Sequence, residues 1–176
     1  MLHSGTLLLA YAFTWQVIMP VQANFLTQLP SLAMVMYLPF GIKVISAFFE
    51  GWRSMVYLAP GAAIGLGLFT NLRFDAPLTY LTFLASYGAA PAVFCLLDWA
   101  LGRDRQFHSP KVGWRILLFG GLVTSVVSPV MIHLVRYQTM PSSDFALSLT
   151  KYMVGDIVGL VAVLFLLLAV FRLSRA

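Results

Sequence analysis

Three residues in the second half of the chain have the types and spacing for proton or ligand chemistry. His133 and Arg136 are three positions apart, so they share one face of a helix. Asp156 falls in the next apolar run, at nearly the same predicted depth as His133. Histidine titrates near neutral pH, and a neighbouring carboxylate raises its pKa. The trio therefore predicts either a satisfied structural cluster or a site that responds to a proton or a ligand.

A second group of charges, Lys43, Glu50 and Arg53, interrupts an apolar stretch. Lys43 and Glu50 are seven positions apart, nearly two helical turns, and so share a face. A charge at mid-membrane is energetically costly and usually functional, whereas a lysine near the boundary extends its side chain to water. Both interpretations stand for Lys43. Glu50 and Arg53 are expected to form an ion pair at the membrane boundary.

Beyond these charges, the sequence shows no catalytic or metal-binding pattern. It has no paired carboxylates beside a base, no His-x-x-x-His and no phosphate-binding loop. The one cysteine, Cys95, lies in an apolar run, which indicates packing. The three histidines are expected at different depths or sides, which disfavours haem ligation. We therefore expect neither enzyme activity, nor a metal, nor a cofactor.

The composition indicates that lipid surrounds the elements that carry these residues. Of the 176 residues, 60% are hydrophobic and only 10% are charged, against about 25% charged in soluble domains. Such a chain has too few polar residues to cover a surface in water. The net charge of +5 fits basic membrane loops better than nucleic-acid binding. We expect one integral membrane domain over residues 1–176, an all-α polytopic helix bundle.

Proline, glycine and charge signals divide the chain into six expected transmembrane helices. They lie near residues 5–23, 30–49, 53–70, 78–101, 115–136 and 152–173. The first is interpreted as a permanent span, not a cleaved signal peptide. Basic residues favour the cytoplasmic side, and a cytoplasmic N-terminus places eight Lys and Arg residues there, against three outside. The eight are Lys43, Arg53, Arg103, Arg105, Lys111, Arg115, Arg172 and Arg175, and the three are Arg73, Arg136 and Lys151. Both termini are therefore expected in the cytoplasm.

Small residues and prolines within these segments predict how the helices pack. Pairs of small residues four positions apart let two helix backbones approach closely. The clearest pairs are Gly61 with Gly65 and Gly155 with Gly159. Proline lies inside four expected spans, where it either kinks a packed helix or opens a cavity. These prolines are Pro39, midway along the second span, and Pro60, Pro91 and Pro129.

Residues 31–65, "SLAMVMYLPFGIKVISAFFEGWRSMVYLAPGAAIG", resemble the bacterial membrane-associated sensor domain of the first type. That family has an aromatic–Pro–Pro–small–Gly turn, a helix, a Gly–aromatic–Arg element and an apolar span with Pro and Gly. The matching positions are Tyr37, Pro39, Gly41, Gly51, Trp52, Arg53, Pro60 and Gly61. A late Gly–Asp–x–x–Gly element is matched by Gly155, Asp156 and Gly159. The resemblance covers about 45 residues.

The resemblance implies a sensor in the bacterial inner membrane that detects a small ligand or a membrane condition. Three features depart from the family: its members have about eight spans, they precede an enzyme domain, and one proline of their turn is Leu38 or Phe40 here. A signal is therefore expected to pass to a protein partner. The expected polar site comprises Lys43, Glu50, Arg53, His133, Arg136 and Asp156. Two alternatives stay open: the substrate-binding subunit of a vitamin-type uptake transporter, and an accessory subunit of a larger membrane complex.

Overall fold

A computed structural model describes residues 2–25, 36–69, 77–101, 110–136 and 145–173. All regular elements in these ranges are helical, which confirms the predicted all-α fold. They are α1 (Leu2–Phe13), η1 (Thr14–Ile18, a π-helix), α2 (Met19–Phe25), α3 (Leu38–Glu50), α4 (Arg53–Phe69), α5 (Pro77–Ala100), α6 (Pro110–Arg136) and α7 (Phe145–Leu173). The first three follow one another without a break and form one helical segment.

Among the described residues, four helical segments are long and apolar enough to cross a membrane. They are Leu2–Asn24, Pro77–Ala100, Gly113–Arg136 and Leu149–Leu173. The second and third expected spans correspond to α3 and α4, with 13 and 17 residues. At 1.5 Å per residue α3 extends about 20 Å, short of a hydrocarbon core about 30 Å thick. The expected start of the second span, at residues 30–35, lies outside the described residues.

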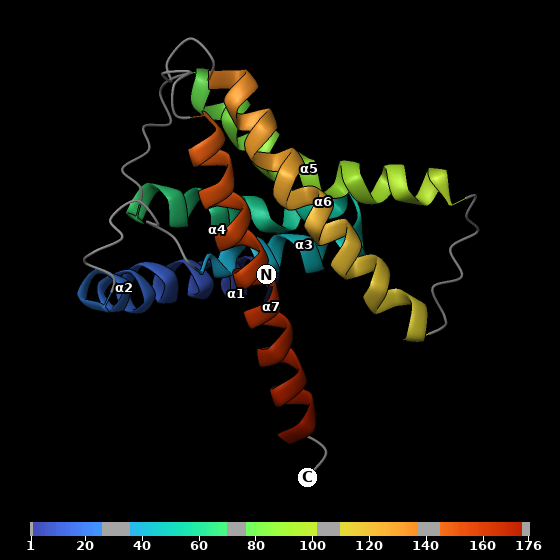
Figure 1. Cartoon of the computed structure of the whole chain (residues 1–176), viewed down its shortest axis with the longest axis horizontal. Helices are drawn as coiled ribbons and strands as arrows, with labels where there is room; N and C mark the ends of the chain where they lie inside the picture. Colours follow the sequence, from blue (N-terminus) through green and yellow to red (C-terminus); the bar gives the residue numbers. More distant parts are fainter. Residues whose placement is uncertain (1, 26–35, 70–76, 102–109, 137–144, 174–176) are drawn as a thin grey trace.

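The outer surface of the helices suggests a membrane protein. The C-terminal half of α7 extends away from the other helices (Figure 1), and its large apolar side chains are exposed. Phe165, Leu168 and Phe171 have 67%, 64% and 62% of their surface uncovered. Such a row of apolar side chains is unfavourable in water and favourable in hydrocarbon. The exterior therefore agrees with the composition in favouring lipid as the surrounding medium.

Helix α3 lies at the centre of the arrangement. It contacts α1, α4, α5, α6 and α7, and its most extensive contact is with α7. Two other pairs pack closely, α5 with α6 and α1 with α4. In Figure 1 the segment α1–α2 and helix α4 lie across the view, whereas α6 and α7 run roughly from top to bottom. The short helix α3 thus joins two groups of helices that run in different directions.

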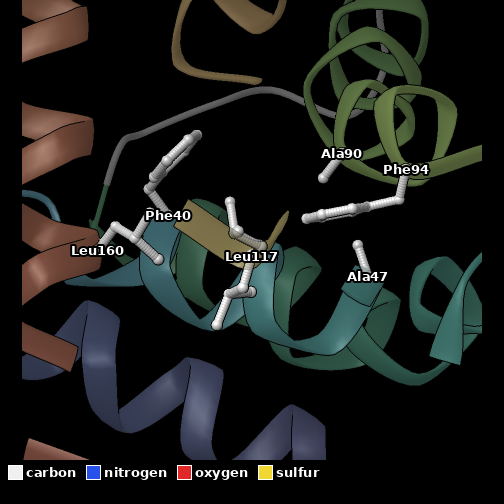
Figure 2. Close-up of a cluster of buried hydrophobic side chains, with 7 residues drawn as sticks. Phe40, Ala47, Ala90, Phe94, Leu117 and Leu160 are labelled. Carbon is white, nitrogen blue, oxygen red and sulfur yellow. The ribbon is translucent and has the colours of Figure 1, made fainter. Parts of the chain in front are cut away.

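A buried apolar cluster holds α3 against α5, α6 and α7. It contains Phe40, Val44, Ala47, Ala90, Phe94, Leu117 and Leu160. Figure 2 shows the Phe94 ring reaching from α5 toward α3, close to Ala47. Phe40, Val44 and Ala47 follow the three- and four-residue spacing of one helix face. This face of α3 is therefore fixed in direction by packing.

A second cluster joins α1 to α4 and includes Leu7, Tyr11, Leu58, Ala62 and Tyr87. Glycines allow the close approach of the two helices. A Cβ added at Gly61 would overlap the backbone carbonyl of Ser4, and one added at Gly65 would overlap the Tyr11 ring. The predicted small-residue pair of α4 thus lies where α4 meets α1.

The prolines occupy two kinds of position. Pro60, Pro91 and Pro129 lie inside α4, α5 and α6, and α5 changes direction part-way along its length in Figure 1. The prediction for Pro39 was wrong, because α3 begins at Leu38 and Pro39 lies in its first turn. The first N–H groups of a helix have no partner within it. Pro39 therefore starts the helix without removing a hydrogen bond.

Candidate functional site

The start of α3 is seated directly on α7. The Tyr37 N–H donates to the Gly155 carbonyl at 3.0 Å. Both Gly155 and Gly159 are buried, and a Cβ added at Gly159 would overlap the Tyr37 carbonyl. Only residues without a side chain permit this backbone contact. Because Asp156 follows Gly155, the contact also holds Asp156 beside α3.

A cavity of about 140 Å³ lies next to this contact. Five elements contribute to its wall, namely η1, α3 with the preceding Tyr37, α5, α6 and α7. The lining residues are Trp15, Tyr37, Lys43, Ser86, Ser128, Pro129, Ile132, Lys151, Tyr152, Gly155 and Asp156. Tyr152 is 44% exposed, whereas Lys43 and Asp156 are only 6% and 7% exposed. The two charges therefore lie at the deep end, and the cavity is shallower toward Tyr152.

The Lys43 side chain is held by polar and aromatic groups of α5. Its Nζ donates to Ser86 Oγ at 3.1 Å and to the Ser86 carbonyl at 3.5 Å. The ammonium also lies 4.8 Å from the centre of the Tyr87 ring, and 5.7 Å from that of Phe40. A cation over an aromatic face is stabilised electrostatically, more strongly when it is shielded from water. The Lys43 ammonium is thus buried inside the protein and held against α5.

Asp156 provides the opposite charge in the same cavity. Its carboxylate and the Lys43 ammonium interact electrostatically. In the part of the chain that the structure describes, no direct ion pair joins them, and Lys43 Nζ bonds to Ser86 instead. Buried charges are costly unless they are paired or hydrogen-bonded. Both side chains line the cavity, so a polar molecule bound there could contact both charges.

Three tyrosine hydroxyls form a chain beside the cavity. Tyr37 donates to the Tyr11 hydroxyl at 3.1 Å, and the Tyr11 and Tyr87 hydroxyls are 2.9 Å apart. Tyr37 lines the cavity, Tyr87 lies under Lys43, and Tyr11 packs against α4 at Gly65. The chain thus connects the cavity to the α1–α4 contact through hydrogen bonds.

The π-helix η1 brings Trp15 to the cavity. In this segment the Met19 N–H bonds back to the Thr14 carbonyl, five residues earlier. Pro20 follows and has no N–H to donate. Trp15 Nε1 is buried and has no hydrogen-bond partner among the described residues. Single π-turns within helices are frequent at functional sites, and this one adds an indole donor beside the cavity.

The structure gathers only part of the predicted polar site. Lys43 and Asp156 line the cavity together, whereas His133 and Arg136 are absent from its wall. His133 Nδ1 lies 3.1 Å from the Pro129 carbonyl of its own helix. Asp156 interacts with Lys43 of α3, and the Gly155–Tyr37 contact holds this part of α7 against the start of α3.

Glu50 and Arg53 also lie apart from the cavity. Between them, Gly51 has a φ of 56° and ends α3, and α4 begins at Arg53. No ion pair joins the two side chains, both of which the structure describes, so the expected pair is a wrong prediction. The turn at Gly51 separates the helices that carry them, and Arg53 is exposed.

Sequence reasoning missed Ser86, Tyr87 and Trp15. Ser86 and Tyr87 follow Ala85 in a run of small residues, where a serine has no distinctive signal. Trp15 precedes Pro20 by five positions, and a proline near the end of an apolar helix was the available indication of irregular geometry. Within the described ranges, no group of three or more His, Cys, Asp or Glu side chains could hold a metal ion.

In its described residues the chain is all-helical, and a charged cavity lies among the helices. Four apolar helices in these ranges suggest a membrane protein. Comparisons of the chain with family models, with curated protein sequences and with solved structures gave no match. The resemblance to the sensor domain therefore stays a prediction.

Proposed function

We propose that this chain is a non-enzymatic, multi-pass protein of the bacterial inner membrane that binds a small polar ligand and signals through a protein partner. One observation carries the proposal: Lys43 and Asp156, from different helices, lie nearly buried in one cavity. Charges are expensive in an apolar interior, and those found there usually serve binding or transport. A ligand that bridges them would offset part of this cost.

The position of the cavity supports a route from ligand to helix movement. Its wall includes the start of α3, which contacts five other helices. A ligand shifts a conformational equilibrium only when it binds one state better than the other. A ligand between Lys43 and Asp156 would favour the state in which α3 and α7 hold those charges at the bridging distance. The tyrosine chain from Tyr37 to Tyr11 would extend that preference to α4.

The proposed topology has six crossing segments with both termini in the cytoplasm. Four segments have the length for this, and α3 and α4 would cross with help from their flanking residues or from a locally thinner bilayer. In this orientation, the ends of α6 and α7 near Arg136 and Lys151 face outward. The shallow side of the cavity, at Tyr152, would then open toward the outside of the cell.

A solute-uptake subunit is the second candidate, because the same cavity could hold a transported molecule. Ligand pockets for drug-sized or vitamin-sized molecules usually measure about 300–1,000 Å³. The cavity of about 140 Å³ is smaller, and this favours a receptor for a small solute over a vitamin-type carrier. An accessory role in a larger complex needs no charged cavity, and we rank it third.

Native pull-down of the full chain from bacterial membranes tests the proposal. The material is analysed by mass spectrometry for both companion proteins and bound small molecules. A kinase or cyclic-dinucleotide enzyme together with a retained small molecule is the expected result. An ATPase module would instead support the transporter, and a stable large complex without a bound molecule would support the accessory role.

Single-cysteine labelling tests the proposed topology. Cys95, the one cysteine, is first replaced by serine, and single cysteines are then placed at Ser4, Trp52, Trp114 and Lys151. An impermeant thiol reagent applied to intact spheroplasts is expected to label only the Lys151 position. Labelling from outside at the Trp52 or Trp114 position would contradict the proposed topology. It would mean that the orientation is the reverse or that one of the six segments does not cross.

A further inference from the structure

The cavity has features that limit the chemical class of its ligand, given the proposed role as a small-molecule receptor. Its volume is about 140 Å³. An apolar cavity of about 150 Å³ holds one benzene molecule, with about six heavy atoms. A ligand that lies wholly within this cavity is therefore about as large as glycine or alanine, and an aromatic amino acid or a nucleotide is too large to be enclosed in it.

The charges at the deep end of the cavity are opposite and belong to different helices. Lys43 from α3 and Asp156 from α7 interact without forming a direct ion pair within the described part of the chain. A ligand with one charge would pair with one of them and repel the other. A ligand that carries both a carboxylate and an ammonium would pair with both.

The remaining wall adds to this selectivity. Lys151 also lines the cavity and is half-buried. Its ammonium is a second positive charge that attracts a carboxylate. Pro129 and Ile132 add apolar surface, which suits a hydrogen or a methyl side chain. The Trp15 side chain also lines the wall, and its Nε1–H has no hydrogen-bond partner among the described residues. This N–H is a donor, and a carboxylate accepts hydrogen bonds from donors.

We propose that the cavity binds a small zwitterionic α-amino acid, of the size of glycine or alanine, with its carboxylate toward Lys43 and its ammonium toward Asp156. This inference rests on the proposed function, since it names the ligand class of that same receptor. It assigns Lys43 and Asp156 as the binding residues and Trp15 and Lys151 as additional contacts for the carboxylate.

Binding measurements on the full chain in lipid nanodiscs test the inference. Alanine and glycine are compared with propionate, which lacks the ammonium, with propylamine, which lacks the carboxylate, and with phenylalanine, which is too large. Saturable binding of alanine and glycine, at least tenfold tighter than that of the other three, is expected. The inference would be overturned if propionate, propylamine or phenylalanine bound as tightly as alanine and glycine. It would also be overturned if none of the five compounds bound.

Charge variants give a second, independent result. Asp156→Asn keeps the shape and removes the negative charge, so alanine binding should fall at least tenfold. Propionate should then bind at least as well as alanine, because its repulsion by Asp156 is gone. Glu50→Gln is the matched control, since Glu50 is a carboxylate of α3 outside the cavity wall, and it should leave alanine binding within about twofold. Alanine binding that survives Asp156→Asn would refute the assigned orientation.

Lys43→Gln should weaken alanine binding by a similar factor, with exposed Arg53→Gln as its matched control. If the buried substitution prevents folding, Ser86→Ala removes the hydroxyl that accepts from Lys43 Nζ at 3.1 Å, keeps the Ser86 carbonyl, and should weaken binding severalfold. Unchanged binding in Ser86→Ala would then count against the assignment.

Recovery of a different small molecule from native membranes would overturn the amino-acid inference alone, whereas recovery of neither ligand nor signalling partner would overturn the proposed function.

Discussion

The α3–α7 contact and the α1–α4 contact are built in the same way but have different surroundings. In each, a glycine allows a helix to touch the backbone of its neighbour: Gly159 lies against the Tyr37 carbonyl and Gly61 against the Ser4 carbonyl. Each glycine also belongs to a small-residue pair four positions apart. The common geometry follows from the need for close packing where lipid supplies no hydrophobic force between helices.

The neighbours of the two contacts decide what each can do. The α1–α4 contact is bordered by the buried side chains of Leu7, Leu58 and Ala62. The α3–α7 contact is bordered by the cavity that holds Lys43 and Asp156. A small-residue pair thus sets how closely two helices approach, and the residues beside it determine whether the contact is purely structural or part of a candidate binding site.

The largest expected effects come from truncating one buried side chain in each region. Phe40 and Leu58 are 1% and 2% exposed. Phe40→Ala should lower the free energy of unfolding by about 3–5 kcal/mol, and Leu58→Ala by about 2–5 kcal/mol. Denaturant titration in mixed micelles measures both.

The two truncations should differ in ligand binding. The Phe40 ring lies 5.7 Å from the Lys43 ammonium, so its loss also weakens binding at the cavity. Leu58 belongs to the other cluster, and Leu58→Ala should leave the affinity of the folded fraction unchanged. Equal losses of affinity would mean that the two regions act as one unit.

Gly159→Ala and Gly61→Ala should cause the next largest loss of stability. Each added methyl group must displace a backbone, and overpacking of this kind costs about 1–3 kcal/mol. Only Gly159→Ala should weaken binding, because it moves Tyr37 away from the cavity. Thermal unfolding and ligand titration of both variants measure the two effects.

Gly88→Ala is the control for these glycine substitutions. Its added Cβ would meet nothing closer than Met55 Cε at 3.8 Å, an ordinary contact. Alanine also favours a helix by up to about 1 kcal/mol over glycine, so this variant should be as stable as the parent or slightly more stable. A loss as large as that of Gly159→Ala would show that the close contacts are not the cause.

Tyr87→Phe should have a smaller effect. It removes the hydroxyl that is 2.9 Å from the Tyr11 hydroxyl, and a typical hydrogen bond contributes about 0.5–1.5 kcal/mol to stability. The ring remains under Lys43, so ligand affinity should change little, while any coupling between the cavity and α4 should weaken. Hydrogen exchange of α4 with and without ligand measures that coupling. Undiminished protection on ligand addition would exclude the tyrosine chain as its route.

Phe165→Ala should have the smallest effect. Phe165 is 67% exposed on α7, and substitutions at such positions usually change stability by less than about 0.5 kcal/mol. Phe165→Ala and Phe40→Ala are the same substitution at an exposed and at a buried position, so their difference in stability measures the effect of burial. A loss above about 2 kcal/mol would indicate that another protein, not lipid, covers this part of α7.

Much of the fold could be predicted from local information. The ends of the expected segments near 53–70 and 78–101 agree closely with α4 and α5, because proline, glycine and charge at those positions act on the adjacent backbone. The second segment was predicted less well. Its charged residues were assigned to a helix of full span length, whereas α3 is 13 residues long.

The candidate site was predicted only in part. Lys43 and Asp156 stood out because a charge in an apolar run is unusual, and both line the cavity. Their meeting could not be derived, because depth along a helix follows from the rise per residue but direction around its axis does not. His133 has a similar predicted depth and bonds within its own helix instead.

The amino-acid sequence by itself determined that the chain is helical and that hydrocarbon suits its exterior, since both follow from composition and from spacing along the chain. Tertiary structure alone decided that Asp156 faces Lys43, because the backbone contact of Gly155 with Tyr37 fixes the rotation of α7 against α3. The same packing brings Ser86 and Trp15 from distant segments to the cavity. Rotation about a helix axis is set by all neighbours at once, and no short stretch of sequence encodes it.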